Sequence, residues 1–452
     1  MIAGTLVEAA GWTEGRLRGA DAAYSGVGTD SRAISPGSLY VALRGERFDA
    51  HDFLPQVMAA GAAGAVVSRG AELPLPQIEV EDTRLALGRL AAAWRAKLGV
   101  QVIAVTGSNG KTTVKEMLAA ILGAQGPVLA TRGNLNNDIG VPLTLLGLGF
   151  EHRSAIVEMG CSAPGEIAYL TAIVRPAVAV INNAGPAHLD GFGTVAAVAR
   201  GKGEILQGLA ESGVAVFNGD DPYASLWRSL AGARRSLSFG LGASCEVRGE
   251  LLQGPGNRFS VHAGADSVQV DLPLPGRHNV MNALAAAAAA WAAGLSLEAV
   301  SAGLARVAGV PGRLQLRPGL GGSQLIDDSY NANPVSLRAA MQTLAGLGGR
   351  GWLVLGDMAE LGEDAIALHA QAGLEACRLG LERLYALGPM SAEAAQAFDG
   401  GVRRYAELEP LVASLRDDLQ RAGAGVHVLV KGSRSARMER VVSVLAAAGG
   451  ER

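Results

Sequence analysis

Short apolar runs separated by helical patterns constrain the fold of this chain more than any other feature. Residues 102–105, 155–157 and 178–181 lack the polar–apolar alternation of a half-exposed strand. Uninterrupted runs of this kind are typical of parallel strands that are buried on both faces, with helices between them. The sequence therefore predicts an α/β protein whose core is a parallel sheet.

Length and composition limit the classes of protein that fit. A chain of 452 residues predicts about three domains, at roughly 150 residues each. The hydrophobic share of 49% excludes a disordered chain, and a net charge of −3 excludes a polybasic nucleic-acid binder. The most apolar run, residues 283–295, is too short to cross a bilayer. The three cysteines form no CxxC pair and the N-terminus lacks a basic signal region, so we expect a cytoplasmic protein without membrane insertion.

Three α/β domains are predicted from the order of the patterns. Residues 1–95 indicate a small N-terminal unit, and residues 96–310 indicate a central domain with a parallel sheet. A break follows at residues 310–312. Residues 311–452 then repeat the alternation of strands and helices, which predicts a second doubly wound, Rossmann-like domain. Its last predicted helix covers residues 436–448.

A glycine-rich turn lies between the predicted strand at 102–105 and a predicted helix that begins at Lys111. It is a shortened phosphate-loop pattern, GxxGKT, in which Val105 stands where a full motif would have its first glycine. Backbone N–H groups of such a turn cradle phosphate oxygens, and the lysine reaches the terminal phosphates. The strand–turn–helix context favours phosphate binding over a plain surface turn. The candidate residues are Gly107, Ser108, Asn109, Gly110, Lys111, Thr112 and Thr113.

Two polar residues come near the carboxyl ends of the next predicted strands, where open α/β sheets bind ligands. Glu158 directly follows residues 155–157, and a carboxylate at that place can hold Mg²⁺ against a nucleotide. His188 lies in the loop after residues 178–181. A charged strand end and a structural histidine are the alternative interpretations, and the neighbouring phosphate-binding turn favours the functional ones.

Lysine is rare in this chain, because only five of its 39 basic residues are lysines. A lysine that persists therefore marks a position that arginine, which cannot lose its proton, is less able to fill. Lys202 falls on the apolar stripe of a helix predicted over residues 194–209. Its side chain either snorkels to the surface or is a buried amine that can add CO₂ to give a carbamate. The sequence leaves both alternatives open.

Two further patterns allow a functional and a structural interpretation. Asn279 and Asn282 share one face of a predicted helix at 279–294, where they either read an adenine edge or serve as a helix cap and a solvent-facing amide. Residues 431–434, Lys-Gly-Ser-Arg, follow a predicted strand. They form either a receptor for a carboxylate or phosphate, or a basic helix cap.

Together and in order, these motifs resemble the Mur ligase family of ATP-dependent amide-bond-forming enzymes over essentially the whole chain. Residues 133–142, 329–334, 356–362 and 431–434 are similar to the branch that joins D-alanyl-D-alanine to UDP-N-acetylmuramoyl-tripeptide. The Asp-Asn-Pro-Arg motif of the sibling that adds the third peptide residue is absent. Residues 29–32 and 44–51 resemble the UDP-sugar-binding unit of that branch.

The resemblance implies a role for each matching residue. Lys111 would contact the ATP phosphates, Thr112 would bind one Mg²⁺, and Glu158 and His188 would hold a second, supported by an N6-carboxylysine at position 202. The residues implied for the rest of ATP are His278, Asn279, Asn282, Arg313 and Asp327. The residues implied for the two other substrates are Ser31, Arg44, Arg47, Phe48, Asn134, Asn136, Asn137, Asn331, Asn333, Lys431 and Arg434.

The implied reaction passes through an acyl phosphate and gives UDP-N-acetylmuramoyl-pentapeptide, ADP and phosphate. The resemblance also implies a monomer whose last domain swings to bring Arg313, Asp327 and Lys431 inward. Another Mur-type ligase, such as the third-residue-adding enzyme or folylpolyglutamate synthase, is the alternative enzyme. A nucleotide-binding regulator is the non-catalytic alternative, although it would not require Glu158, His188 and Lys202 together.

Overall fold

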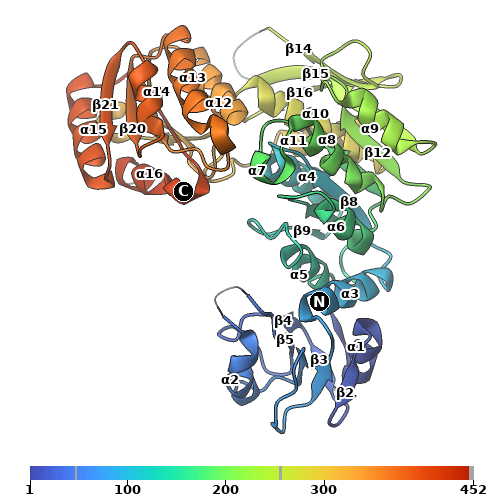
Figure 1. Cartoon of the computed structure of the whole chain (residues 1–452). Helices are drawn as coiled ribbons and strands as arrows, with labels where there is room; N and C mark the ends of the chain where they lie inside the picture. The colour runs from blue at the N-terminus through green and yellow to red at the C-terminus, as the bar shows by residue number, and fades with distance from the viewer. Residues whose placement is uncertain (46–47, 254–256, 447–452) are drawn as a thin grey trace.

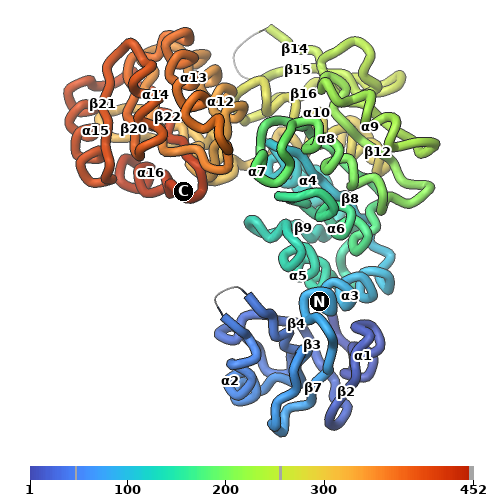
Figure 2. The backbone as a smooth tube through the Cα atoms, viewed as in Figure 1, coloured from blue at the N-terminus to red at the C-terminus, as the bar shows by residue number. Residues whose placement is uncertain are grey.

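The computed structural model describes residues 1–45, 48–253 and 257–446, which form three α/β units in chain order (Figure 1). Figure 2 follows the chain from the blue N-terminal unit through the middle domain to the red C-terminal domain. The middle domain contacts both of the others. No helix within the described ranges combines the length and apolar character that crossing a lipid bilayer requires.

The N-terminal unit is built on a five-stranded sheet of order β2-β7-β6-β5-β4, beside a two-stranded β1-β3 ribbon. Helix α3 starts at the N-cap Asp82, packs against α5 of the middle domain, and so joins the two units. The elements of the unit are β1 (Ala3–Thr5), α1 (Leu6–Thr13), β2 (Arg16–Arg18), β3 (Ala23–Ser25), β4 (Val27–Gly28), β5 (Leu39–Val41), α2 (Leu54–Ala59), β6 (Gly64–Val67), β7 (Gln77–Glu79) and α3 (Thr83–Ala96).

The middle domain contains a nine-stranded sheet of order β16-β15-β14-β13-β12-β11-β8-β10-β9. Its strands are β8 (Gln101–Thr106), β9 (Val128–Ala130), β10 (Ser154–Glu158), β11 (Val178–Ile181), β12 (Val214–Asn218), β13 (Arg235–Gly240), β14 (Val247–Leu251), β15 (Asn257–Ala263) and β16 (Asp266–Leu272). The strands from β9 to β14 pair in parallel, as predicted. At one edge of the sheet, β14, β15 and β16 form an antiparallel meander that the sequence analysis did not anticipate.

Helices cover both faces of this sheet, which explains the uninterrupted apolar runs. In β8, Val102 and Ala104 belong to the core cluster on one face, while Ile103 and Val105 belong to the cluster on the other. The first cluster continues into the N-terminal unit. The helices are α4 (Lys111–Gly123), α5 (Gly140–Leu146), α6 (Glu166–Val174), α7 (Leu189–Phe192), α8 (Val195–Gly203), α9 (Ala224–Ala231), α10 (Arg277–Ala292) and α11 (Leu297–Leu304).

The C-terminal domain has a six-stranded sheet of order β17-β18-β22-β19-β20-β21, in which only β17 is antiparallel to its neighbour. Because β22 returns between β18 and β19, the carboxyl ends of these three strands lie side by side. The strands are β17 (Gln315–Pro318), β18 (Gln324–Asp328), β19 (Arg350–Gly356), β20 (Arg383–Leu387), β21 (Gly401–Tyr405) and β22 (Val426–Lys431). The helices are α12 (Pro334–Gly346), α13 (Ala365–Arg378), α14 (Ser391–Ala397), α15 (Leu408–Ala422) and α16 (Glu439–Leu445).

Two predicted helices have different bounds in the structure. The helix predicted over residues 194–209 ends at Gly203, and a single 3₁₀ turn (Glu204–Leu206) follows it. The helix predicted over residues 436–448 begins at Glu439, because a 3₁₀ turn and a left-handed residue, Arg437, precede it. Residues 447 and 448 of that prediction lie outside the described ranges.

Candidate active site

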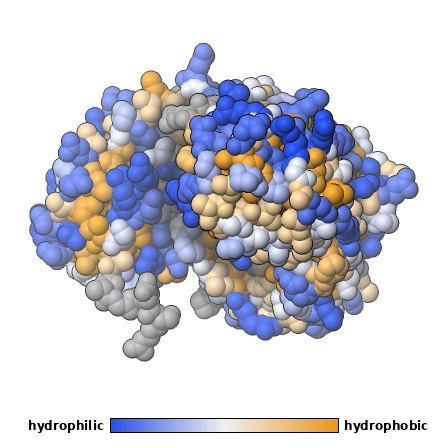
Figure 3. Space-filling model, turned by 90° about the horizontal axis from the view of Figure 1, so that it is seen from below, coloured by the Kyte–Doolittle hydropathy of each residue, from blue (hydrophilic) through white to orange (hydrophobic). Residues whose placement is uncertain are grey.

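A cavity of about 1060 Å³ lies between the middle and C-terminal domains. In Figure 3 the surface is hollowed between two masses of the molecule, and hydrophilic residues border the hollow. The middle domain contributes the glycine turn from Ser108 to Thr112, together with Glu158 and His188. The C-terminal domain contributes the opposite wall, and the start of α3 in the N-terminal unit reaches one end.

The glycine turn links β8 to α4 and aims the N-terminus of α4 at the cavity. Gly110 has φ +79°, and a Cβ there would come within 2.2 Å of the Asn282 side-chain oxygen, so the position requires glycine. The Lys111 ammonium donates to the Gly107 carbonyl at 2.7 Å, which holds the lysine across the turn. Exposed N–H groups at a helix N-terminus favour an anion, as predicted for this motif.

Positive charge gathers at this end of the cavity. The pKa of Lys111 is lowered to about 8, mainly by burial and also by the positive charges of Lys202 and Arg313, while Glu158 opposes this shift. No described carboxylate forms an ion pair with any of these three cations. A bound polyphosphate would supply the negative charge that the site lacks.

Glu158 ends β10 and is almost completely buried, with 2% of its surface exposed. Its two carboxylate oxygens accept hydrogen bonds from the Thr112 hydroxyl at 2.9 Å and from the Asn136 amide at 2.7 Å. Among the described residues, no group of three or more His, Cys, Asp or Glu could hold a metal by itself. A carboxylate beside a hydroxyl suits Mg²⁺ when phosphate oxygens and water complete the coordination, so these residues fit that ion.

Lys202 is buried in α8, with 1% of its surface exposed, which excludes the snorkelling alternative. Its ammonium lies 3.1 Å from the thiol of Cys161, and Cys161 lines the cavity. Lys115 is also buried and donates to the Thr131 carbonyl, whereas Lys97 is exposed and pairs with Glu8. A buried amine next to the cavity that forms no ion pair with a carboxylate among the described residues fits the chemistry of carbamate formation.

His188 connects the two walls of the cavity. It begins α7 in a left-handed conformation, with φ +55°, and its Nδ1 lies 2.6 Å from a carboxylate oxygen of Glu360 in the C-terminal domain. Burial is the main cause that lowers the pKa of His188, and Glu360 opposes that effect. Lys111 and Lys202 also lower it, so these cations are near neighbours of the ring.

Asn279 and Asn282 brace the glycine turn from behind. Both lie in α10 and are buried, so the alternative of a solvent-facing amide is wrong. Asn282 accepts a hydrogen bond from Asn182 at 2.9 Å and donates to Asn279 at 3.2 Å, and Asn182 in turn donates to the Asn109 carbonyl. These two amides, His278, Gly107 and Thr113 do not line the cavity.

The opposite wall is formed by loops at the carboxyl ends of the C-terminal strands. The aromatic ring of Tyr330 lies 4.3 Å from the Arg313 guanidinium and 5.6 Å from that of Arg434. Asn333 caps α12 and also donates to the Asn109 side chain at 2.8 Å, directly across the domain boundary. Asn331 lines the same wall. The structure therefore brings these candidates within reach of the glycine turn.

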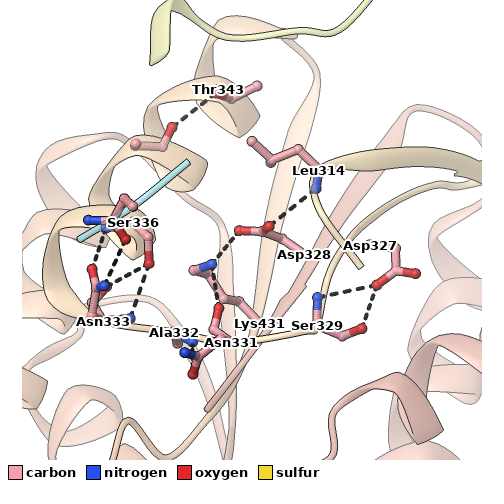
Figure 4. Close-up of polar contacts among 12 residues, drawn as sticks. Leu314, Asp327, Asp328, Ser329, Asn331, Ala332, Asn333, Ser336, Thr343 and Lys431 are labelled. Carbon is pink, nitrogen blue, oxygen red and sulfur yellow. Dashed lines mark hydrogen bonds and ion pairs between the residues drawn. The ribbon is translucent and has the colours of Figure 1, made fainter. Parts of the chain in front are cut away.

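Two predicted residues of this domain do not line the cavity. Lys431 is buried, forms an ion pair with Asp328, and donates to the Asn331 carbonyl at 2.9 Å (Figure 4). Asp327 accepts hydrogen bonds from the hydroxyl and N–H groups of Ser329. Of the two adjacent aspartates, sequence reasoning selected Asp327 and missed Asp328. Asp328 lies opposite Lys431 because β18 pairs with β22 in that register.

The N-terminal candidates lie away from the cavity. Ser31, Arg44 and Phe48 do not line it, and Arg47 lies outside the described residues. Asn134, Asn136 and Asn137 do line it. Sequence reasoning missed many other cavity residues, among them Arg84, Tyr330 and Glu360. Only the positions of Tyr330 and Glu360, inside motifs 329–334 and 356–362, could have marked them.

Comparisons with known proteins agree across the chain. The profile described as "Mur ligase family, catalytic domain" matches residues 23–95, "Mur ligase middle domain" matches residues 105–290, and "Mur ligase, glutamate ligase domain" matches residues 312–434. The chain is 46% identical over 448 residues to the UDP-N-acetylmuramoyl-tripeptide–D-alanyl-D-alanine ligase of Escherichia coli (strain K12), which covers 98% of this chain and 99% of the relative.

Solved structures agree with the sequence comparisons. A crystal structure of MurF from Acinetobacter baumannii matches with a TM-score of 0.93 and 38% identity, covering 98% of both chains. MurF ligase from Thermotoga maritima in complex with ADP matches with a TM-score of 0.83 and 29% identity, covering 93% of this chain and 96% of the other. Because these matches span all three domains at substantial identity, the chain belongs to the Mur ligase family.

Proposed function

We propose that this chain is an ATP-dependent ligase that joins D-alanyl-D-alanine to UDP-N-acetylmuramoyl-tripeptide. The products are UDP-N-acetylmuramoyl-pentapeptide, ADP and phosphate. One observation carries the proposal: the glycine turn, the buried Glu158 and a wall bearing arginines face a single cavity between two domains. The relative at 46% identity bears the name of this activity, and one similar structure contains ADP.

The protein first has to bring two anions together. The N-terminus of α4, Lys111 and Arg313 would bind the ATP phosphates, because they supply positive charge that no described carboxylate neutralises. Asn134 and Asn137 line the cavity between the glycine turn and the start of α3, where the tripeptide substrate would enter. Its nucleotide-sugar end would extend to the N-terminal unit, with Ser31, Arg44 and Phe48 as candidate contacts.

Thr112, Glu158 and His188 are the residues that would hold Mg²⁺, with a carboxylated Lys202 as a further anionic support. Magnesium ions would supply charge neutralisation at the phosphates. The residues for the nucleoside of ATP remain proposals. Asn279 and Asn282 stand behind the turn, and we propose that α10, with His278 in its first turn, holds the nucleotide through its N-terminal end.

The reaction then follows from the chemistry of carboxylates. An oxygen of the tripeptide carboxylate attacks the γ-phosphorus of ATP, the bond to ADP breaks, and an acyl phosphate forms. The amine of D-alanyl-D-alanine attacks the acyl carbon, an amide bond forms, and phosphate leaves. Water would hydrolyse the intermediate, so the two domains must enclose it, and residues of both line the cavity. We place this reaction in the cytoplasm and expect a monomeric enzyme.

Release of ADP tests the proposal. With UDP-N-acetylmuramoyl-tripeptide and ATP, we expect rapid ADP release only after D-alanyl-D-alanine is added. Lys111→Ala should abolish release while circular dichroism stays unchanged, because the phosphates lose their main cation. Lys97→Ala, which removes an exposed lysine, is the matched control and should behave as the wild type. ATP turnover that does not depend on the dipeptide would refute the assignment.

A further inference from the structure

Glu360 stands out among the acidic residues that line the cavity. The five carboxylates of the lining are Asp82, Asp138, Glu158, Glu166 and Glu360. Each of the first four has a hydrogen-bond or ion-pair partner within the N-terminal unit or the middle domain. Glu360 is the one carboxylate that the C-terminal domain contributes, and its one described polar partner is His188 on the facing wall.

The backbone presents Glu360 rigidly to the cavity. It follows β19 and has φ +61°, a left-handed conformation that is costly for a residue with a side chain. Its neighbours Met358 and Leu361 are buried in the core of the C-terminal domain, and the Met358 N–H donates to the buried His369 at 2.9 Å. The Glu360 side chain itself remains more than half exposed, at 58%. Buried residues therefore anchor the loop on both sides of Glu360, and the Glu360 carboxylate extends away from the core of the C-terminal domain.

The wall around Glu360 carries both signs of charge. Arg434, with 60% of its side chain exposed, lines the same wall, where it also pairs with Glu439, and the guanidinium groups of Arg434 and Arg313 lie 5.6 Å and 4.3 Å from the ring of Tyr330. The incoming dipeptide is a zwitterion, because its α-amino group has a pKa of about 8 and its carboxyl group is ionised. A wall with a carboxylate and guanidinium groups matches both ends of such a molecule.

Glu360 also lies on the side where the nucleophile has to arrive. Glu360 lines the same cavity as Lys111, and its carboxylate lies 2.6 Å from the ring of His188 on the wall of the middle domain, so it faces the phosphate-binding end. The acyl phosphate would form at that end, and the attacking amine has to approach from the wall opposite the middle domain. Glu360 is the acidic group on that approach.

We propose that Glu360 binds the ammonium group of the incoming D-alanyl-D-alanine and orients it toward the acyl carbon. This inference rests on the proposed function and extends it by naming a residue that selects the second substrate. In the protein without substrates Glu360 contacts His188, and the ammonium group would take the place of that ring. The inference concerns binding and orientation, and it assigns no proton transfer to Glu360.

The test compares the dipeptide with an analogue that lacks its charge. Propionyl-D-alanine keeps the carbon skeleton of D-alanyl-D-alanine but replaces the ammonium group by a hydrogen atom. For Glu360→Gln we expect the KM for D-alanyl-D-alanine to rise about 10- to 100-fold, the loss typical of a charged hydrogen bond. The inhibition constant of propionyl-D-alanine should stay within twofold of the wild-type value, as should the KM for ATP.

Other outcomes would overturn the inference. If Glu360→Gln weakens the dipeptide and propionyl-D-alanine equally, the carboxylate acts only as a contact between domains. If the KM for ATP rises instead, Glu360 acts on the nucleotide. Glu363→Gln removes a neighbouring exposed carboxylate outside the cavity lining and should leave all constants unchanged. A wild-type enzyme without dipeptide-dependent turnover would instead refute the proposed function, so the two failures are distinguishable.

Discussion

The individual side chains that matter most are lysines, because a lysine can lose its charge whereas an arginine cannot. Lysine is scarce in this chain, yet four of its five lysines, Lys111, Lys115, Lys202 and Lys431, are buried or line the cavity. Arginine would keep its full charge at such positions. The burial of each lysine therefore shows which of these rare residues have a special role. It separates the four buried or cavity-lining lysines from Lys97, which lies at the surface.

The carbamate that we propose for Lys202 predicts chemical rescue. Lys202→Ala should lower kcat about 100-fold, the loss typical of a residue that supports a metal site. Formate or acetate should restore part of that activity, because a small carboxylate can occupy the space of the missing carbamate. The measurement is ADP release against carboxylate concentration. Lys111→Ala lacks a cation rather than an anion, so the same acids should not restore it, and rescue of both variants would contradict the assignment.

His278 predicts a pH dependence of stability. Burial, the main cause, lowers the pKa of His278 to about 4 from an ordinary value of 6.5. The unfolded chain therefore binds a proton more readily than the folded one, so stability is complete above pH 6.5 and declines as the pH falls toward 4. The loss is at most about 3 kcal/mol, at 1.36 kcal/mol per pKa unit.

The variant His278→Gln tests whether protonation of His278 causes stability to fall at low pH. Its melting temperature, followed by differential scanning fluorimetry from pH 7 to pH 4, should fall less steeply than that of the wild type. His262 is a half-exposed histidine in the antiparallel meander, and His262→Gln serves as the matched control that should keep the wild-type slope. A parallel decline of wild type and His278→Gln would show that His278 does not take up the proton.

At the level of elements, a buried ion pair ties two neighbouring parallel strands of the C-terminal domain together. Lys431 ends β22 and Asp328 ends β18, and the two residues are paired in register. Lys431 also donates to the Asn331 carbonyl (Figure 4). The Asn331 side chain in turn accepts a hydrogen bond from the Arg434 N–H at 3.3 Å. In this structure Lys431 shapes the wall of the cavity from behind.

Removal of one partner of this pair should therefore affect stability. Lys431→Met leaves Asp328 buried without a counter-charge and should reduce the free energy of unfolding by about 3–5 kcal/mol. The double variant Asp328→Asn with Lys431→Met removes both charges and should recover most of that loss. Urea unfolding followed by tryptophan fluorescence measures both. An unchanged stability of Lys431→Met would instead support direct contact of the lysine with substrate.

Much of the architecture could be predicted because it depends on local patterns. The apolar runs at β8, β10 and β11 and the turn before α4 are specified by neighbouring residues, and the structure has them where they were predicted. The antiparallel meander from β14 to β16 was missed, because its pairing depends on contacts between strands rather than on one continuous run. Glu360 was missed as a site residue for the same reason, since its partner His188 is distant in sequence.

At the scale of the whole molecule, the site exists only where domains meet. Asn333 donates to Asn109, and Glu360 pairs with His188, so the C-terminal domain touches the nucleotide-binding domain at two polar points. The chain between the two domains passes through Gly312, whose carbonyl accepts a hydrogen bond from Tyr330 at 3.2 Å. Arg313 follows directly. The linker thus sets the position of the wall that carries Arg313 and Tyr330.

Gly312→Ala should therefore impair catalysis from outside the cavity. Gly312 has φ +71°, and a Cβ there would lie 3.1–3.2 Å from Tyr330 atoms, so alanine adds strain of about 1 kcal/mol and shifts the ring. We expect kcat to fall about 10- to 100-fold, because small displacements of positioning groups are costly. Gly309→Ala, in the same linker but without a positive φ, makes only an ordinary contact and should be neutral. Equal kcat values for the two variants, measured by ADP release, would show that the geometry of the linker does not position Arg313 for the reaction.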